Sequence, residues 1–66
     1  MFEKNKWYRY HECVFRVISE RDYRGVWMCI AYFPGQTPLK GGVDIGVYGG
    51  SEVLTQEEAD IYRMGL

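Results

Sequence analysis

The sequence predicts a mainly β domain of the α+β class, in which a small, strongly curved antiparallel sheet of three to five strands precedes a short C-terminal helix. Aromatic and β-branched residues recur in runs that end at glycine or proline, a pattern typical of strands joined by turns. A capping box near the C-terminus indicates where the helix begins. The length of 66 residues suits a single domain, residues 1–66, and excludes folds that need several βαβ units.

The N-terminal half predicts a hairpin. Residues 1–6 are mostly polar, and we expect them to fray. From Trp7 to Ser19 aromatic and β-branched residues dominate, and the alternation between Cys13 and Val17 suits a strand. The charged segment Ser19–Gly25 ends in glycine and is therefore suited to connect the two strands of a hairpin.

The next segment, Val26–Phe33, is apolar at almost every position, which predicts a central strand covered on both faces. A buried helix is the alternative, but the short length and the flanking Gly25 and Pro34 favour a strand. The pair Pro34–Gly35 is a turn signal, because proline presets its φ and glycine accepts a positive one. We expect a loop from Phe33 to Gly42.

Two further short strands are expected after this loop. Val43, Ile45 and Val47 alternate with less apolar residues, as in a half-buried strand that ends at Gly49–Gly50. Residues 51–54 then add a short last strand.

The C-terminal helix carries the clearest local signal. In the capping box Thr55–Glu58, each side chain can bond the backbone amide of the other residue. Acidic residues follow in the first turn and Arg63 stands in the last turn, as the helix dipole favours. Ala59, Tyr62 and Leu66 are expected to share one side of the helix, with Ile61 beside them.

This order of elements resembles the small barrels of the Src-homology-3-like kind (SH3-like). The resemblance rests on a curved sheet, a long Pro/Gly loop and a terminal helical turn, and it implies no functional residues. One short helix cannot cover both apolar faces of Val26–Phe33 together with the other aromatic residues. We therefore expect a strongly bent sheet and also a second copy of the chain, in a homodimer.

The composition excludes several classes of protein. Eight Lys and Arg against nine Asp and Glu give a net charge of −1, which does not fit a general nucleic-acid binder. The longest apolar stretch, Val26–Pro34, is too short to span a bilayer, so we expect no membrane contact. Without a signal-peptide pattern at the N-terminus, the expected location is the cytoplasm.

No arrangement of residues predicts a metal site, a cofactor or catalysis. His11, Cys13 and Cys29 lack the paired spacing of a zinc site. With one histidine and a short scaffold, no activated nucleophile can be assembled, so we do not expect an enzyme. The two cysteines are expected to be packed as free thiols rather than joined in a disulfide.

The leading hypothesis is a non-enzymatic small binding protein that acts by protein–protein contact, as a regulator or inhibitor of the accessory kind that phages encode. Tyrosine, tryptophan and arginine dominate the energetics of protein interfaces. The expected contact residues are therefore Trp7, Tyr8, Arg9 and Tyr10, then Tyr23 and Arg24 in the hairpin loop, with the rim 34–40.

Two alternatives stay open. The first is an oligomer that binds a small ligand or nucleotide through Arg16, Gly42, Asp44, Tyr48, Gly49 and Gly50. The second is a nucleic-acid-binding module, less favoured by the net charge, that uses the basic aromatic strip of residues 4–11. The strip belongs to a basic first part of the chain: residues 1–24 carry six basic and four acidic side chains, against two and five in residues 25–66.

Overall fold

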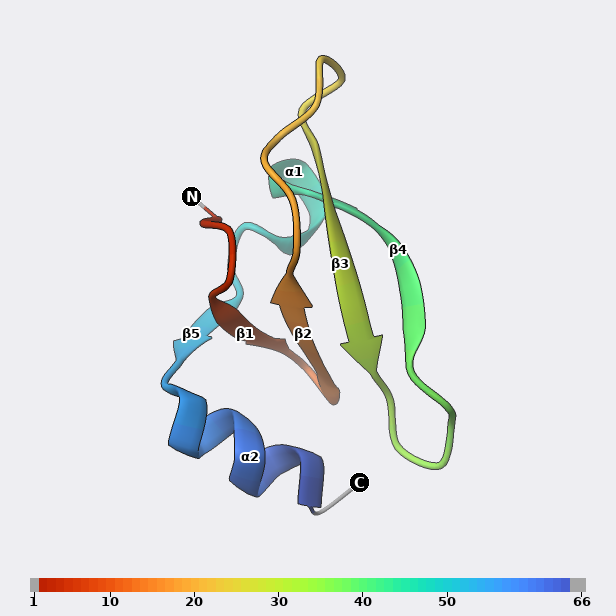
Figure 1. Cartoon of the computed structure of the whole chain (residues 1–66), viewed down its shortest axis with the longest axis vertical. Helices are drawn as coiled ribbons and strands as arrows, with labels where there is room; N and C mark the ends of the chain where they lie inside the picture. Colours follow the sequence, from red (N-terminus) through yellow and green to blue (C-terminus); the bar gives the residue numbers. More distant parts are fainter. Residues whose placement is uncertain (1, 65–66) are drawn as a thin grey trace.

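The computed structural model describes residues 2–64 and, at position 47, the backbone alone. It is a five-stranded antiparallel sheet in the order β4-β3-β2-β1-β5 with a short C-terminal helix (Figure 1). The strands are β1 (Trp7–Tyr10), β2 (Cys13–Val17), β3 (Val26–Tyr32), β4 (Leu39–Asp44) and β5 (Glu52–Leu54), and the helices are α1 (Ile45–Tyr48) and α2 (Gln56–Met64). The mainly β α+β class is confirmed. Closure into an SH3-like barrel is not, because the ladder ends at β4 on one side and at β5 on the other.

The segment from Trp7 to Ser19 forms two strands, not one. A two-residue turn, His11–Glu12, separates β1 from β2, with Tyr10 directly opposite Cys13. His11 has a φ of 54°, a left-handed conformation that histidine tolerates better than most residues. The sequence hides this turn because it contains no glycine, proline or asparagine.

The prediction of a strand over residues 43–48 is confirmed as far as Asp44 and is wrong for the residues after it. Strand β4 begins at Leu39, inside the expected loop, and its last pair is Val26 with Asp44. Strand β3 begins at Val26, so the residues after Asp44 have no neighbouring strand there and form the helical turn α1 instead. Gly49 ends this turn, where a Cβ would collide with the carbonyl oxygen of Ile45.

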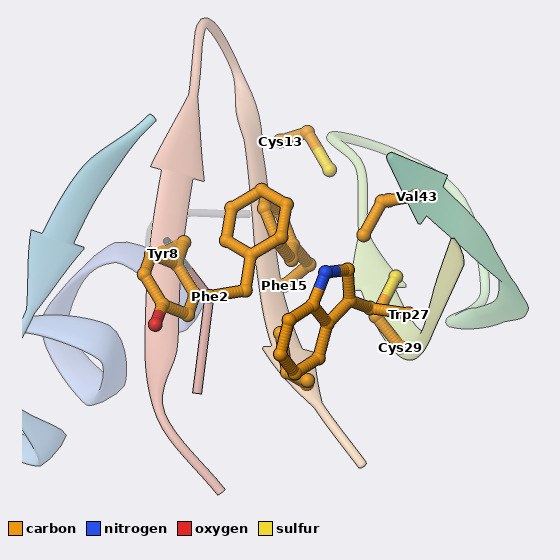
Figure 2. Packing of buried hydrophobic residues seen from close by; sticks show 8 residues of the cluster. Phe2, Tyr8, Cys13, Phe15, Trp27, Cys29 and Val43 are labelled. Carbon is orange, nitrogen blue, oxygen red and sulfur yellow. The ribbon is translucent and has the colours of Figure 1, made fainter. Parts of the chain in front are cut away.

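The sheet buries one layer of side chains on each face. The first layer, here called the aromatic core, consists of Phe2, Tyr8, Cys13, Phe15, Val17, Trp27, Cys29 and Val43 (Figure 2). The second, here called the helix-side core, lies beneath α2 and consists of Trp7, Val14, Leu54 and Ala59. Alternation along each strand sends neighbouring side chains into different layers, as β geometry requires.

Residues 2–6 are held to the sheet, which differs from the expectation that residues 1–6 fray. Phe2 is 3% exposed and meets the rings of Tyr8, Phe15 and Trp27 edge to face. The Asn5 amide donates to the Val17 carbonyl at 2.7 Å. Phe2, the single apolar residue of this segment, therefore attaches residues 2–6 to the sheet.

The expected central strand is confirmed as β3, but it is fully covered on one face alone. Trp27 and Cys29 are buried in the aromatic core, whereas Val26, Met28 and Ile30 are half-buried on the other face. Helix α2 covers that face over β1, β2 and β5, at the far end of the sheet from β4. On this face, the part of the sheet formed by β3 and β4 is therefore partly exposed to solvent.

The capping box of α2 is confirmed. The Thr55 amide donates to the Glu58 carboxylate at 2.9 Å, and the Glu58 amide donates to the Thr55 hydroxyl at 3.1 Å. Ala59 is buried and Tyr62 packs against the helix-side core. Ile61, which was expected beside them, instead lies on the outer side of the helix and is 68% exposed. Leu66 lies outside the described residues.

Candidate functional site

The structure removes Trp7 and Tyr8 from the expected contact surface. Trp7 is 6% exposed and Tyr8 is 3% exposed, because successive residues of β1 point into the two core layers. The Trp7 indole donates to the Gln56 side chain at 3.0 Å, and the Arg63 guanidinium lies 4.3 Å from its ring centroid. The basic aromatic strip is therefore no stacking platform at these two positions.

Arg9 and Tyr10 are half-buried and are engaged within the chain. The Arg9 guanidinium lies 4.6 Å from the Tyr62 ring centroid and forms an ion pair with Glu52 at 3.0 Å. The Tyr10 ring meets the Tyr48 ring at a centroid distance of 5.0 Å. Of the expected contact residues, this leaves Tyr23 and Arg24 fully on the surface, together with the exposed rim 34–40.

Tyr23 and Arg24 occupy the end of the β2–β3 hairpin, which projects from the body of the sheet (Figure 1). We call Arg21–Gly25 the hairpin tip. The Asp22 carbonyl accepts from the Gly25 amide at 3.0 Å, and the Val26 carbonyl accepts from the Asp22 amide at 2.9 Å. Gly25 has a φ of 81°, so the tip is a tight turn closed by a left-handed glycine. Tyr23 is 95% exposed on this turn.

The carboxylate of Asp22 fixes the hairpin tip. One oxygen accepts from the Arg24 amide at 2.8 Å and from the Val26 amide at 3.0 Å. The other oxygen binds the Arg24 guanidinium at 2.8 Å. The Val26 amide and then the Arg24 side chain lower the pKa of Asp22, because both stabilise the ionised carboxylate. The carboxylate is therefore ionised at neutral pH, where its hydrogen bonds stabilise this turn.

Two adjoining cavities lie at the other end of the hairpin, on the face of the aromatic core. The outer cavity has a volume of about 550 Å³ and the inner one about 240 Å³, and Cys13, Phe33 and Tyr48 line both. Tyr10, His11 and Glu12 complete the lining of the outer cavity. The inner cavity is lined by Cys13, Phe15, Cys29, Ala31, Phe33, Leu39, Lys40, Gly41, Gly42, Val43 and Tyr48.

The residues expected to bind a small ligand are divided by the sheet. Gly42 and Tyr48 both line the inner cavity. Asp44 ends β4, and the glycines 49 and 50 follow α1, so these three are near in sequence but line neither cavity. Arg16 lies apart from both cavities, because it alternates with Phe15 and is therefore on the α2 side of the sheet, 5.9 Å from the Trp7 ring centroid.

Phe33 lines both cavities and was not among the residues expected to bind a ligand. Residue 33 was expected to end the central strand or begin a loop, and its packing against the aromatic core depends on contacts far away in sequence. Gly41 faces Cys29 across the β3–β4 ladder. The sequence feature that indicates the cavity is a group of small residues on one face of the sheet. This grouping can be recognised when the register of the strands is known.

Both cysteines are buried free thiols, as expected. Cys29 pairs with Val17, which lies four positions from Cys13 along β2, so about 13 Å of strand separates the two positions. That separation exceeds the reach of a disulfide, whose Cα atoms lie within about 7 Å. Burial raises the pKa of both thiols, that of Cys29 to about 11 with a further contribution from Cys13.

The raised pKa of Cys29 predicts a loss of stability in alkali. Between its ordinary value of 9.0 and about 11, the unfolded chain releases the thiol proton while the folded chain keeps it. The free energy of unfolding should therefore fall as the pH rises through this interval, by at most about 1.4 kcal/mol per pH unit for this thiol. Urea denaturation at pH 8 and pH 10 measures the change, and Cys29→Ala should reduce it. An equal loss in both proteins would contradict this assignment.

No group of three or more His, Cys, Asp and Glu side chains suited to a metal ion occurs among residues 2–64. Within the same range, neither helix combines the length and the apolar character that crossing a membrane requires. Comparison with family models, with curated proteins and with solved structures found no match to this chain. The hairpin tip and the two cavities are therefore the features of this chain from which a function can be inferred.

Proposed function

We propose that the chain is a non-enzymatic binding protein that acts by protein–protein contact through its hairpin tip. The observation that carries this proposal is Tyr23, whose side chain is 95% exposed at the end of a projecting hairpin. A large aromatic side chain gains most when it enters a desolvated pocket of a partner. Tyr23 is therefore the proposed anchor residue.

The hydrogen bonds that stabilise the turn support this role. Asp22 bonds the backbone amides of Arg24 and Val26, and Gly25 closes the turn. A contact residue on a preformed turn loses little conformational entropy on binding, which favours affinity. The hairpin tip is thus prepared to present Tyr23 without rearrangement.

The charges beside Tyr23 indicate the kind of partner surface. Arg21 and Arg24 are exposed on either side of it, and Arg24 lies 5.8 Å from the Tyr23 ring centroid. Asp22 neutralises part of the Arg24 charge, whereas Arg21 forms no ion pair among residues 2–64. We propose an apolar pocket with an acidic rim, and a regulatory or inhibitory effect that results from filling it.

Replacing Tyr23 with alanine should abolish partner binding and leave the fold intact. The side chain is exposed, so the expected change in the free energy of unfolding is below about 0.5 kcal/mol. Loss of an anchor residue at an interface costs about 2 kcal/mol or more, which is at least about 30-fold in affinity. Affinity capture from lysate of the source cells, with the protein immobilised, measures the loss.

The matched control is Ile61→Ala, an exposed apolar residue on α2. Proteins retained by the original chain and by Ile61→Ala, but lost with Tyr23→Ala, identify partners of the hairpin tip. Asp22→Ala should weaken the same capture because the turn loses its bonds. Equal capture by the original chain and by Tyr23→Ala would refute the proposal.

A homodimer is a further part of the proposal. Val26, Met28 and Ile30 are half-buried on the part of the sheet that α2 does not cover, and the edge strand β4 lies beside them. A second copy placed there would bury these residues and protect the edge. Light scattering at micromolar concentration should therefore give about twice the mass of the chain, and a stable mass of 7.8 kDa would contradict a dimer.

A further inference from the structure

The outer cavity has three aromatic walls that come from distant parts of the chain. Tyr10 ends β1, Phe33 follows β3, and Tyr48 belongs to α1. The rings of Tyr10 and Tyr48 lie 5.0 Å apart with an angle of 74° between their planes, an edge-to-face contact in the lining of the cavity. Aromatic faces carry negative potential, and several of them around one space attract an organic cation.

The charged side chains around the outer cavity also favour a cation. The described lining residues of this cavity include one carboxylate, Glu12, and one imidazole, His11, whose ring lies 4.3 Å from that of Tyr10, but neither lysine nor arginine. Glu12 is exposed at the turn between β1 and β2 and has no ion-pair partner among residues 2–64. A cation placed between the rings would therefore meet an uncompensated negative charge at the cavity mouth.

The inner cavity continues from the outer one and suits an apolar group. Small side chains leave the space open: Cys13, Cys29 and Ala31 line it, and a Cβ added at Gly41 would meet nothing within 4 Å. Its volume of about 240 Å³ exceeds the roughly 150 Å³ that is sufficient for benzene. Lys40 pairs with Ile30 across the β3–β4 ladder, so its side chain points to the opposite face of the sheet and brings no charge into the inner cavity. The charged end of a ligand therefore belongs beside Glu12 in the outer cavity.

We propose that the two cavities together bind a small organic ammonium compound. Its ammonium group lies between Tyr10, Phe33 and Tyr48 beside Glu12, and its apolar arm extends into the inner cavity over Gly41. This site is at the opposite end of the β2–β3 hairpin from Tyr23, so it is independent of the proposed partner contact.

The first test compares choline with its neutral isostere dimethylbutanol, in which a quaternary carbon replaces the nitrogen. Titration of the full chain, followed by NMR, should shift signals of the cavity residues, with choline binding about tenfold more tightly than the isostere. Equal affinity of the two compounds would show that charge has no role, and would overturn the proposal.

Two variants separate the two parts of the site. Glu12→Gln should weaken choline binding at least about threefold and leave the isostere unaffected, whereas Glu57→Gln, an exposed carboxylate on α2, is the matched control. Gly41→Val should fold, because its Cβ has open space and valine suits a strand. In the original chain, benzyltrimethylammonium should bind more tightly than tetramethylammonium, because its benzyl group enters the inner cavity. Gly41→Val should remove this difference in affinity, because the valine side chain fills the inner cavity. Unchanged choline binding in Glu12→Gln, or an unchanged difference in affinity in Gly41→Val, would contradict the proposed arrangement.

The last arm of the experiment concerns the source of the ammonium group. A short peptide that carries trimethyl-lysine presents the same cation on a polypeptide. We expect it to bind no more tightly than benzyltrimethylammonium, because the inner cavity encloses a small arm. Tighter binding of the peptide would assign the site to a modified protein and overturn the assignment to a free small molecule.

Discussion

Replacing Trp7 with alanine is expected to unfold the domain, with a loss of about 3–5 kcal/mol in the free energy of unfolding. Domains of this size have a total stability of roughly 5 kcal/mol, so the loss is close to the whole. Chemical denaturation followed by circular dichroism measures it. A loss at the upper end of this range would leave the variant mostly unfolded at physiological temperature.

The size of the effect follows from the position of Trp7 between β1 and α2. Its ring fills the helix-side core beside Val14 and Leu54. The Arg63 guanidinium lies 4.3 Å from its ring centroid, and its indole nitrogen donates to Gln56. Alanine would leave a cavity and would also remove the partners of two α2 side chains, so the helix would lose its attachment to the sheet.

The matched variant is Trp7→Phe, which keeps an aromatic ring and removes the indole donor. We expect a loss of about 1–2 kcal/mol, from the hydrogen bond to Gln56 and the smaller volume. The contrast with Tyr23 is the decisive comparison, because both residues were expected at an interface. A Trp7→Ala protein that unfolds at the original denaturant concentration yet loses its partner would return Trp7 to the contact surface.

Local interactions account for what the sequence predicted correctly. The capping box of α2 depends on Thr55 and Glu58, which are three residues apart, and both of its bonds are formed. The hairpin between β2 and β3 depends on a charged turn that ends at Gly25. Signals of this kind are complete within a few residues, so no knowledge of the rest of the fold is needed to interpret them.

Contacts between residues far apart in the sequence account for the features that the sequence did not predict. The alternation of residues 43–48 is typical of a strand, but the first residue of β3, Val26, decides where β4 can pair. The burial of Trp7 requires α2, which begins 49 residues later at Gln56. For the same reason the cavity over Gly41 was not predicted, because four separate segments form its walls. The candidate contact at Tyr23 needed no such information, since its turn is local.

Replacing Phe2 with alanine is expected to cost about 3 kcal/mol, the lower end of the range for a buried phenylalanine. The result would be unusual for a residue so near the N-terminus, where substitutions are commonly tolerated. Phe2 lies between Tyr8 and Trp27 over the aromatic core (Figure 2), with ring centroids 4.9 Å and 6.2 Å away. Urea denaturation of the variant measures the loss.

The segment itself provides the control. Lys4 is exposed, and Lys4→Ala should change the free energy of unfolding by less than about 0.5 kcal/mol. If Phe2→Ala were as stable as Lys4→Ala, residues 2–6 would be a frayed end, as their polar composition suggested. A large difference between the two would show that one aromatic side chain holds this segment against the sheet. The N-terminal segment would then be part of the cover of the aromatic core, because the Phe2 ring packs against the rings of Phe15 and Trp27.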